Sequence, residues 1–294
     1  MKKKEPFEFY LNRYYTPQTV KSYVFTVSNF IKNHPNAVKF QHKDIVSYLA
    51  DLGGKIPSVV TRNTMLCAIK KYYDYLIAIK TRNDHPCKTM RIKGENIAKR
   101  TQVQFQELFT AQELETLLDR ENRYKYLELR NKLIISFLIY QGLTCEEITQ
   151  LNIGNIDYDA QTVYIKPTRR LRSRTVQLKP NQINWLHVYL KHHRNKLAKT
   201  PTKRLFIGIR GDSETVEGIG GMLEPLKTLY PERPLSAQAI RMSVIANWIN
   251  VNRLPIDKVQ YLAGHKWPSS SLKYKRIDLN IQREKLAKWH PIFS

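Results

Sequence analysis

Residues 235–276, LSAQAIRMSVIANWINVNRLPIDKVQYLAGHKWPSSSLKYKR, carry the clearest pattern in the chain. Apolar side chains recur at helical spacing over the first half of this stretch, which predicts an amphipathic helix that carries Arg241. Pro255 and Gly264 occupy favoured positions at the two ends of a second helix. The stretch therefore predicts two short helices, packed on one face, with a charged side chain on the first.

A histidine and a tyrosine follow the second helix. His265 comes directly after Gly264, and Tyr274 lies nine residues further on, after the turn-forming run 268–271. The order L-S-x-x-x-[IL]-R, then L-x-G-H, then this tyrosine resembles the C-terminal signature of the tyrosine recombinases, or phage integrases. The ending REKLAKWHP, residues 283–291, is similar to the tail of Xer-like members.

The resemblance implies a reaction on DNA. In that family the tyrosine hydroxyl attacks a phosphodiester, forms a 3′-phosphotyrosine and frees a 5′-hydroxyl, which later attacks the partner strand by way of a Holliday junction. The covalent link keeps the energy of the broken bond, so we expect neither a metal ion nor any other cofactor. By this resemblance Tyr274 is the nucleophile, Arg241 contacts the phosphate, and His265 is a second donor or a proton shuttle.

Composition fits an anionic partner. The 294 residues contain 49 Lys and Arg against 25 Asp and Glu, which gives a formal charge of +24, and 42% are hydrophobic. Length and apolar content predict folded domains, and the charge favours DNA, with a merely basic soluble protein and a membrane surface as the alternatives. The sequence contains no apolar run near the ~18 residues of a spanning helix, and its start lacks the apolar core of a signal peptide. We expect a cytoplasmic, nucleoid-associated protein without membrane contact.

The fold class expected is mostly α with a small β-hairpin or sheet. We assign residues 1–87 to a helical, SAM-like core-binding domain, 88–107 to a basic linker and 108–294 to the catalytic domain of a tyrosine recombinase. Helical periodicity in the first domain covers residues 19–33, 42–52 and 58–80, and the second of these helices is expected to stop at Gly53 and Gly54.

The third of these helices has a basic outer face. Arg62, Lys70 and Lys71 lie on it and are candidates for contact with a DNA backbone. A solvated basic face is the alternative for each of them.

The catalytic domain begins with a helix over residues 109–118, where Thr110 and Glu113 have capping-box spacing. A buried helix follows over 130–143, and then a β-hairpin with strands at 162–166 and 174–178. The tail, 280–294, is expected to form a short helix. The resemblance implies that this tail docks on a neighbouring protomer of a dimer or tetramer, and packing on its own domain is the alternative.

Two positions depart from the family pattern. The segment GLTCEEITQLNIGNID, residues 142–157, resembles the first arginine box, but Thr144 stands where the family has a catalytic arginine. Loss of one charged donor removes roughly 1.5–3 kcal/mol of transition-state stabilisation. Gln238 stands three positions before Arg241, where the family has histidine, and its amide donates a hydrogen bond but does not shuttle a proton.

The family also places a catalytic lysine in the hairpin, where it protonates the departing 5′-oxygen. Alignment on the returning strand assigns this role to Arg169, and alignment on the first strand assigns it to Lys166. We favour Lys166, because lysine titrates near ~10.4 and its pKa is readily lowered, whereas arginine stays protonated above ~12. Arg170 and Arg172 are candidates for DNA contact, and one of Arg169, Arg170 or Arg172 is a candidate for the charge missing at Thr144.

The sequence thus predicts an integrase or invertase of a mobile element, active in DNA integration or transposition. Its expected partners are a specific double-stranded recombination site and further copies of itself, with accessory DNA-bending proteins as candidate helpers. The first alternative is a DNA-binding relative without catalysis, which Thr144 and Gln238 favour. The second is a relaxing enzyme of the type IB topoisomerase kind, which shares the chemistry but needs no paired sites.

Overall fold

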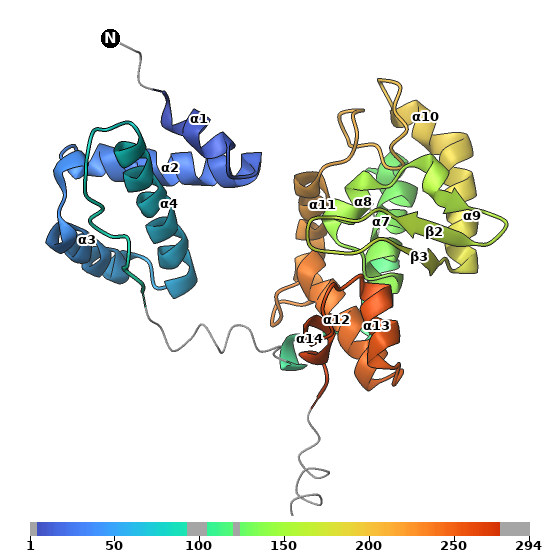
Figure 1. Ribbon diagram of the computed structural model, residues 1–294. Coiled ribbons are helices and arrows are strands. Elements are labelled where there is room, and N and C mark those ends of the chain that lie inside the picture. Colours follow the sequence, from blue (N-terminus) through green and yellow to red (C-terminus); the bar gives the residue numbers. More distant parts are fainter. Residues whose placement is uncertain (1–4, 93–104, 120–123, 277–294) are drawn as a thin grey trace, which may run out of the picture. The chain divides into compact units, whose positions relative to one another are not determined.

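The computed structural model describes residues 5–92, 105–119 and 124–276, and its contacts divide the chain into two compact units (Figure 1). Unit 1 is Met1–Gln102 and unit 2 is Val103–Ser294. The described residues are mainly helical with one small sheet, which confirms the expected fold class. The expected tail helix over residues 280–294 lies outside the described residues.

Unit 1 is a helical bundle. Its helices are α1 (Phe7–Asn12), α2 (Pro17–Asn33), α3 (His42–Lys55) and α4 (Val59–Ala78). The periodic apolar faces of α2 and α4 pack together around Val27, Phe30, Leu66, Ile69 and Tyr73. The short helix α1 has no counterpart in the expected elements, because six residues are too few to show a clear period.

Helix α3 is longer than expected, because its glycines do not end it. Gly53 and Gly54 lie inside the helix and are not among the residues with positive φ. Its C-cap is Ile56, which has extended backbone (φ −126°, ψ 97°) and precedes Pro57. A residue before proline disfavours the α conformation, so the proline sets this boundary.

The end of the expected core-binding domain and the start of the expected linker pack against α4. His85 Nε2 lies 3.1 Å from the carbonyl oxygen of Lys70, and the Lys70 ammonium donates to the carbonyl of Met90 at 2.6 Å. Cys87 is 1% exposed and belongs to the core of unit 1. Of the other expected linker residues, 105–107 form a short 3-10 helix, and 93–104 lie outside the described residues.

Unit 2 is built around helix α7 (Glu128–Tyr140), which corresponds to the expected buried helix. All residues from 133 to 139 are buried, so this part of the helix is enclosed on every side. Helices α9 (Pro180–Val188) and α12 (Ala237–Asn250) pack against it (Figure 1). Unit 2 also contains α6 (Ala111–Glu115), α8 (Cys145–Gln150), α10 (Arg194–Leu197), α11 (Val216–Leu223), α13 (Ile256–Ala263) and α14 (Ser269–Leu272).

A three-stranded antiparallel sheet contains the expected hairpin. Its order is β1 (Ile156–Asp157), β2 (Thr162–Ile165) and β3 (Arg174–Gln177). Val163 pairs with Val176 and Ile165 pairs with Arg174. Because side chains alternate between the two faces of a strand, Arg174 lies on the same buried face as Val176. The sheet thus carries a guanidinium into the interior of unit 2.

Helices α12 to α14 form the expected C-terminal arrangement, with one difference. Ser236 caps α12 by accepting a hydrogen bond from the backbone of Ala239 at 3.1 Å. Gly264 closes α13 in the left-handed conformation, as expected. The run 268–271, expected as a turn, instead contributes to the single helical turn of α14, which begins after Pro268.

The capping box expected at the start of α6 is confirmed. Thr110 Oγ1 accepts from the Glu113 backbone at 3.2 Å, and Glu113 Oε2 accepts from the Thr110 backbone at 2.7 Å. Arg233 forms an ion pair with the other oxygen of Glu113. This box anchors the first helix of unit 2.

Candidate active site

Arg241 lies in the interior of unit 2, in the second turn of α12. It is 8% exposed. Its Nη1 donates to the carbonyl of Gly142, just beyond α7, and its Nη2 donates to the carbonyl of Ala263 at 2.6 Å, at the end of α13. Carbonyl groups at helix ends lack partners within their own helix, so they are natural acceptors for a guanidinium. Arg241 thereby joins three helices.

Gly264 turns the chain from α13 to His265 with φ 68°. A Cβ added at Gly264 would lie 2.4 Å from Arg174 Nη1, so the close approach also requires glycine. The backbone of His265 donates to the carbonyl of Gln260 at 3.0 Å, and His265 is 9% exposed. These contacts fix the imidazole at the edge of the interior.

Tyr274 follows α14 and is 5% exposed. Its ring lies parallel to that of His265, with 6.4 Å between centroids and 9° between planes. Lys273 Nζ lies 5.0 Å from the centroid of the tyrosine ring. Asn250, the last residue of α12, donates to the Tyr274 carbonyl at 2.8 Å and accepts from the backbone of Arg276 at 2.9 Å. The two ends of α12 therefore both serve this site.

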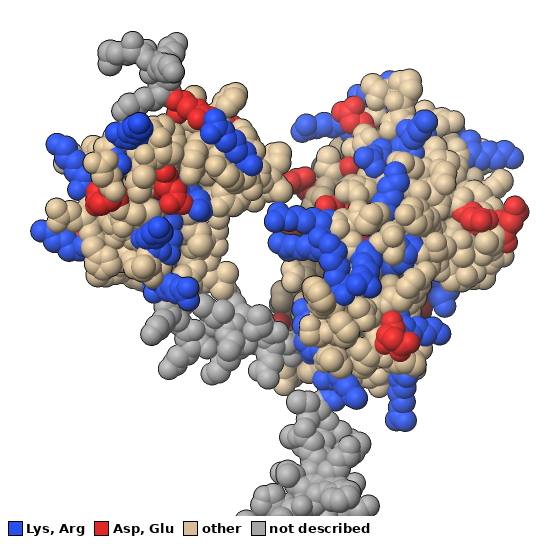
Figure 2. All heavy atoms as spheres, in the orientation of Figure 1, with Lys and Arg blue, Asp and Glu red and all other residues tan. Residues whose placement is uncertain are grey.

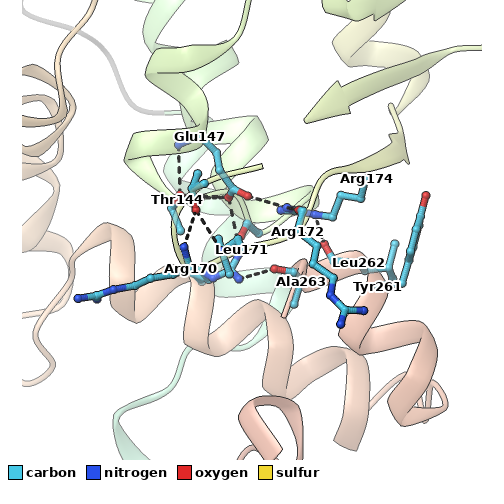
Figure 3. Close-up of polar contacts among 12 residues, drawn as sticks. Thr144, Glu147, Arg170, Leu171, Arg172, Arg174, Tyr261, Leu262 and Ala263 are labelled. Carbon is cyan, nitrogen blue, oxygen red and sulfur yellow. Dashed lines mark hydrogen bonds and ion pairs between the residues drawn. The ribbon is translucent and has the colours of Figure 1, made fainter. Parts of the chain in front are cut away.

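Thr144 and Glu147 form a second capping box, at the start of α8. Thr144 Oγ1 accepts from the Glu147 backbone at 3.2 Å, and Glu147 Oε2 accepts from the Thr144 backbone at 2.9 Å. Arg174 Nη1 donates to Glu147 Oε1 at 2.6 Å, as Figure 3 shows, and both side chains are 0% exposed. Arg241 Nη1 lies 3.9 Å from Glu147 Oε2. One carboxylate is thus shared by two arginines.

The positive charge at this point exceeds the negative charge that faces it. Arg174 Nε donates to the carbonyl of Leu262 at 2.7 Å, whereas its Nη2 is buried without a hydrogen-bond acceptor among the described residues. Carbonyl contacts orient a guanidinium but do not cancel its charge. The site therefore retains net positive charge suited to an anion such as phosphate.

Burial and this positive charge lower the pKa of His265 to about 4. Desolvation is the largest cause, and the charges of Arg241 and Lys273 add to it, while Glu147 acts in the opposite direction. Burial also lowers the pKa of Arg241, but an arginine in contact with a carboxylate stays protonated at neutral pH. At pH 7 the site therefore pairs a charged guanidinium with a neutral imidazole.

The loop between β2 and β3 is fixed beside this site through its backbone. Leu171 forms an isolated antiparallel bridge with His265, and the Arg172 backbone donates to the carbonyl of Gly264 at 2.8 Å. Lys266 Nζ donates to the carbonyl of Arg169 at 2.8 Å. These hydrogen bonds hold the loop against residues 264–266, so it does not project freely from the sheet.

The side chains expected to act from this loop are exposed, namely those of Lys166, Arg169, Arg170 and Arg172. Figure 3 shows Arg170 and Arg172 pointing away from Glu147. Figure 2 shows Lys and Arg side chains gathered on the face of unit 2 that carries the hairpin. This arrangement suits contacts to a DNA backbone next to the buried cluster, and Lys166 and Arg169 both remain candidates for the acid.

The other expected residues have different surroundings. Gln238 is exposed at the second position of α12. In unit 1, Lys71 forms an ion pair with Asp74 at 2.7 Å, and Arg62 has a buried Nε without an acceptor among the described residues. The Lys70 ammonium donates to the Met90 carbonyl at 2.6 Å and so helps to hold the chain against α4, and its contact with DNA stays a prediction.

Three contributors to the site were not expected from the sequence. Arg174 was expected only as the first residue of the returning strand, although its alternation with Val176 signals that it faces inward. Asn250 carries no signal in the sequence for its contact with Tyr274. Ser271 lies in the expected turn, yet its hydroxyl is 2.8 Å from His265 Nδ1.

Within residues 5–92, 105–119 and 124–276, no helix is long and apolar enough to cross a bilayer. No group of three or more His, Cys, Asp or Glu side chains among these residues is arranged to hold a metal ion.

Both units match known protein families. Residues 107–280 match the Phage integrase family, and residues 7–80 match the Phage integrase, N-terminal SAM-like domain. Tyrosine recombinase XerC of Pelotomaculum thermopropionicum is 26% identical over 257 residues, which cover 85% of this chain and 81% of the relative.

Solved structures show a similar fold. The XerH site-specific recombinase bound to a palindromic difH substrate, in a post-cleavage complex, is similar with a TM-score of 0.70 at 20% identity, over 92% of this chain and 79% of that one. The Tn1549 transposon integrase in complex with transposon right end DNA is similar with a TM-score of 0.67 at 16% identity, over 96% and 98% of the two chains.

Proposed function

The chain belongs to the phage integrase family of tyrosine-type site-specific recombinases, and from this premise we propose that it exchanges DNA strands with Tyr274 as the nucleophile. In the first step a bond forms between Tyr274 Oη and phosphorus and the bond to the 5′-oxygen breaks. The tyrosine loses its proton and the 5′-oxygen gains one. The 5′-hydroxyl of a partner strand then attacks the 3′-phosphotyrosine, which regenerates the tyrosine by way of a Holliday junction.

The observation that carries this proposal is the buried cluster of Tyr274, His265 and Arg241. The tyrosine and histidine rings are parallel with centroids 6.4 Å apart, and α12 holds both Arg241 and the backbone of Tyr274. A tyrosine that served only as packing would not need two ionisable neighbours with net positive charge. A nucleophile that attacks a phosphodiester needs that charge, because the transition state places additional negative charge on the phosphate oxygens.

We assign the direct phosphate contact to Arg241 and a supporting charge to Arg174. The carbonyl contacts of Arg241 use one N–H of each terminal nitrogen and leave the rest of its fork for a phosphate. Arg174 is fully buried, so it acts through its field and through Glu147. It is the hairpin cation that contacts Glu147, and for this reason we assign to it the charge missing at Thr144, in place of the exposed loop arginines.

We propose Lys166 as the acid that protonates the departing 5′-oxygen, with Arg169 as the alternative. A substrate with sulfur in place of the bridging 5′-oxygen separates the two, because a thiolate leaves without protonation. Lys166→Ala is expected to cleave the ordinary substrate slowly, by about 10²–10⁴-fold, and the sulfur substrate at the wild-type rate. The acid would be Arg169 if Arg169→Ala cleaved the ordinary substrate slowly and the sulfur substrate at the wild-type rate. Lys166→Ala would then cleave both substrates at the wild-type rate.

The biological setting is proposed on coarser grounds. We infer integration or inversion by a mobile element, and this inference takes its support from the likeness to the Tn1549 transposon integrase. The partners we propose are a specific double-stranded DNA site and further copies of this chain up to a tetramer, with accessory DNA-bending proteins as helpers. The site of action we propose is the nucleoid of the cytoplasm, because the formal charge of +24 suits a chromosome-bound protein.

A second candidate function is specific DNA binding without strand cleavage. Thr144 favours it, because a capped hydroxyl supplies no charge to a phosphate. Both candidates predict salt-sensitive binding to the same DNA. Only the first predicts a covalent complex.

The deciding experiment uses nicked duplexes built from the DNA that flanks the gene. A nick next to the cut site lets a short 5′-hydroxyl fragment diffuse away and traps the phosphotyrosine, which a denaturing gel detects. Wild type is expected to give a covalent band, and Tyr274→Phe is expected to give none.

The matched control is Tyr261→Phe. Tyr261 is an exposed tyrosine on α13 whose hydroxyl contacts the backbone of Thr175, so its variant should keep the covalent band. Tight binding without a covalent band in any nicked register would establish the second candidate instead.

A further inference from the structure

We propose that Ser271 is a positioning residue that holds His265 as the neutral tautomer protonated on Nε2, so that the imidazole donates a hydrogen bond to the scissile phosphate. The inference rests on the proposed function for the identity of the substrate. It goes beyond that function because it assigns the histidine one protonation state and one direction of hydrogen bonding, and names the side chain that imposes them.

The geometry places Ser271 between the histidine and the nucleophile. Ser271 is 0% exposed, and its Oγ lies 2.8 Å from His265 Nδ1. Its carbonyl accepts from the backbone of Tyr274 at 3.0 Å, and its own backbone donates to the carbonyl of Pro268 at 2.9 Å. A single residue thus contacts the imidazole through its side chain and the nucleophile through its backbone.

The direction of the hydrogen bond follows from the hydroxyl's surroundings. Among the described residues, His265 Nδ1 is the one hydrogen-bond partner of Ser271 Oγ. A buried hydroxyl proton without an acceptor is unfavourable by about 1–3 kcal/mol, so the hydroxyl donates to Nδ1. Nδ1 must then be unprotonated, which leaves the ring proton on Nε2.

The charges around His265 favour the neutral ring. Arg241, Lys273 and Arg174 all disfavour a further positive charge there, and Glu147 is the one opposing group. Burial lowers the pKa of His265 to about 4, so the ring is neutral at pH 7. A neutral ring with its proton on Nε2 and its Nδ1 occupied is a donor and does not accept a proton from Tyr274. Of the two roles expected for His265, donor and proton shuttle, we therefore assign the first.

The test begins with the DNA-free protein, so that it does not depend on catalysis. Long-range ¹H–¹⁵N spectra of protein labelled at its eight histidines report the tautomer of each ring, and His265→Gln identifies the signal of interest. Wild type is expected to show His265 protonated on Nε2. Ser271→Ala is expected to show a mixture of tautomers, and Ser271→Thr, which keeps the hydroxyl, should match wild type.

The matched control is Ser269→Ala, an exposed serine of the same helical turn, which should leave the signal unchanged. If Ser271→Ala does not fold, Ser271→Cys replaces it, because a thiol keeps the size but is a weak donor. A wild-type ring protonated on Nδ1, or an Nε2 tautomer that persists without the hydroxyl, would overturn the proposal.

Cleavage of the nicked duplex then measures the consequence. Ser271→Ala is expected to form the covalent complex about tenfold more slowly, the rate equivalent of one lost hydrogen bond. Ser271→Thr should recover most of that rate, and Ser269→Ala should be unaffected. An unchanged rate in Ser271→Ala with a mixed tautomer would overturn the positioning role. A wild-type protein without any covalent complex would overturn the proposed function, while the spectra would still decide the tautomer.

Discussion

Unit 2 contains two capping boxes with the same pattern, T-x-x-E, and nearly the same hydrogen bonds. In the first, Glu113 pairs with Arg233, and the two side chains are 32% and 23% exposed. In the second, Glu147 pairs with Arg174, and both side chains are 0% exposed. The local sequence fixes the cap in both, but the surroundings decide whether the carboxylate only starts a helix or also organises buried charge.

Removal of the two carboxylates should give the largest contrast. Glu147→Gln leaves Arg174 and Arg241 buried without a negative partner, so we expect it to lower the free energy of unfolding by about 3–5 kcal/mol. Glu113→Gln should lower it by about 1 kcal/mol or less, because its ion pair is partly solvated. Urea unfolding measures both, and Glu146→Gln, an exposed neighbour of Glu147, is the control. Equal losses at positions 113 and 147 would refute the difference between the boxes.

The next largest difference is expected in how protonation of His265 and of Glu113 changes the stability at low pH. The pKa of His265 falls from its ordinary 6.5 to about 4, so the unfolded chain binds more protons than the folded one between these values. Stability should therefore decline as pH falls through this window, by roughly 3 kcal/mol. The hydrogen bond from Arg233 is the main cause that lowers the pKa of Glu113 to about 2, so that carboxylate's contribution is lost only below its ordinary value of 4.5.

The control for this window is His265→Gln, studied by urea unfolding at several pH values. The variant should show a flatter pH dependence than wild type between pH 6.5 and about 4.5. The slope of the stability curve for Glu113→Gln should differ from that of wild type only at lower pH. Parallel curves for wild type and His265→Gln would contradict the buried, neutral imidazole.

The capping hydroxyls offer a finer comparison. Thr110→Ala and Thr144→Ala should each lower the free energy of unfolding by about 1 kcal/mol, since each removes one N-cap. Only Thr144→Ala should also slow covalent-complex formation, by roughly fivefold, because about 1 kcal/mol of lost positioning at Glu147 has that effect on a rate. A rate loss in Thr110→Ala of the same size would show that the effect is general destabilisation.

The smallest difference is expected between exposed cations near the two boxes, in the salt dependence of DNA binding. Arg170→Ala is expected to reduce the slope of log binding constant against log salt concentration by ~0.9, the value for one phosphate contact. The control is Lys227, which is exposed, pairs with Glu224 and lies just before Tyr230, whose hydroxyl donates to the Glu113 carbonyl at 2.9 Å. Its alanine variant should leave the slope unchanged. An unchanged slope for Arg170→Ala would remove the loop from the DNA interface.

The sequence predicted those parts of the site that local signals specify. Arg241 and His265 were placed correctly relative to their helices, because apolar periodicity and a glycine end mark both. Residues 166–173 show no regular apolar pattern, so the sequence does not determine how they align with the family's hairpin. For this reason the sequence could not decide between Lys166 and Arg169 as the acid. The partner of Ser271 could not be predicted either, because its contact with His265 exists only once α14 has folded back on the end of α13.

Helix boundaries show the same limit. Two adjacent glycines indicated the end of α3, yet the rigid ring of Pro57 determines it. The inward direction of Arg174 was within reach, since strand alternation already placed Val176 on the buried side. Its pairing with Glu147 was not, because 27 positions separate the two residues and no local rule joins them.

Gly264 limits which positions can be varied when directed evolution is used to change the DNA preference of this protein. Randomisation of the exposed hairpin loop and of Trp267, which is 70% exposed, should yield many folded clones with altered DNA preference. Randomisation of position 264 should yield almost none, because any other side chain meets the guanidinium of Arg174 and strains a backbone at φ 68°. A library should therefore vary these surface positions and keep Gly264, because most of its clones will then fold.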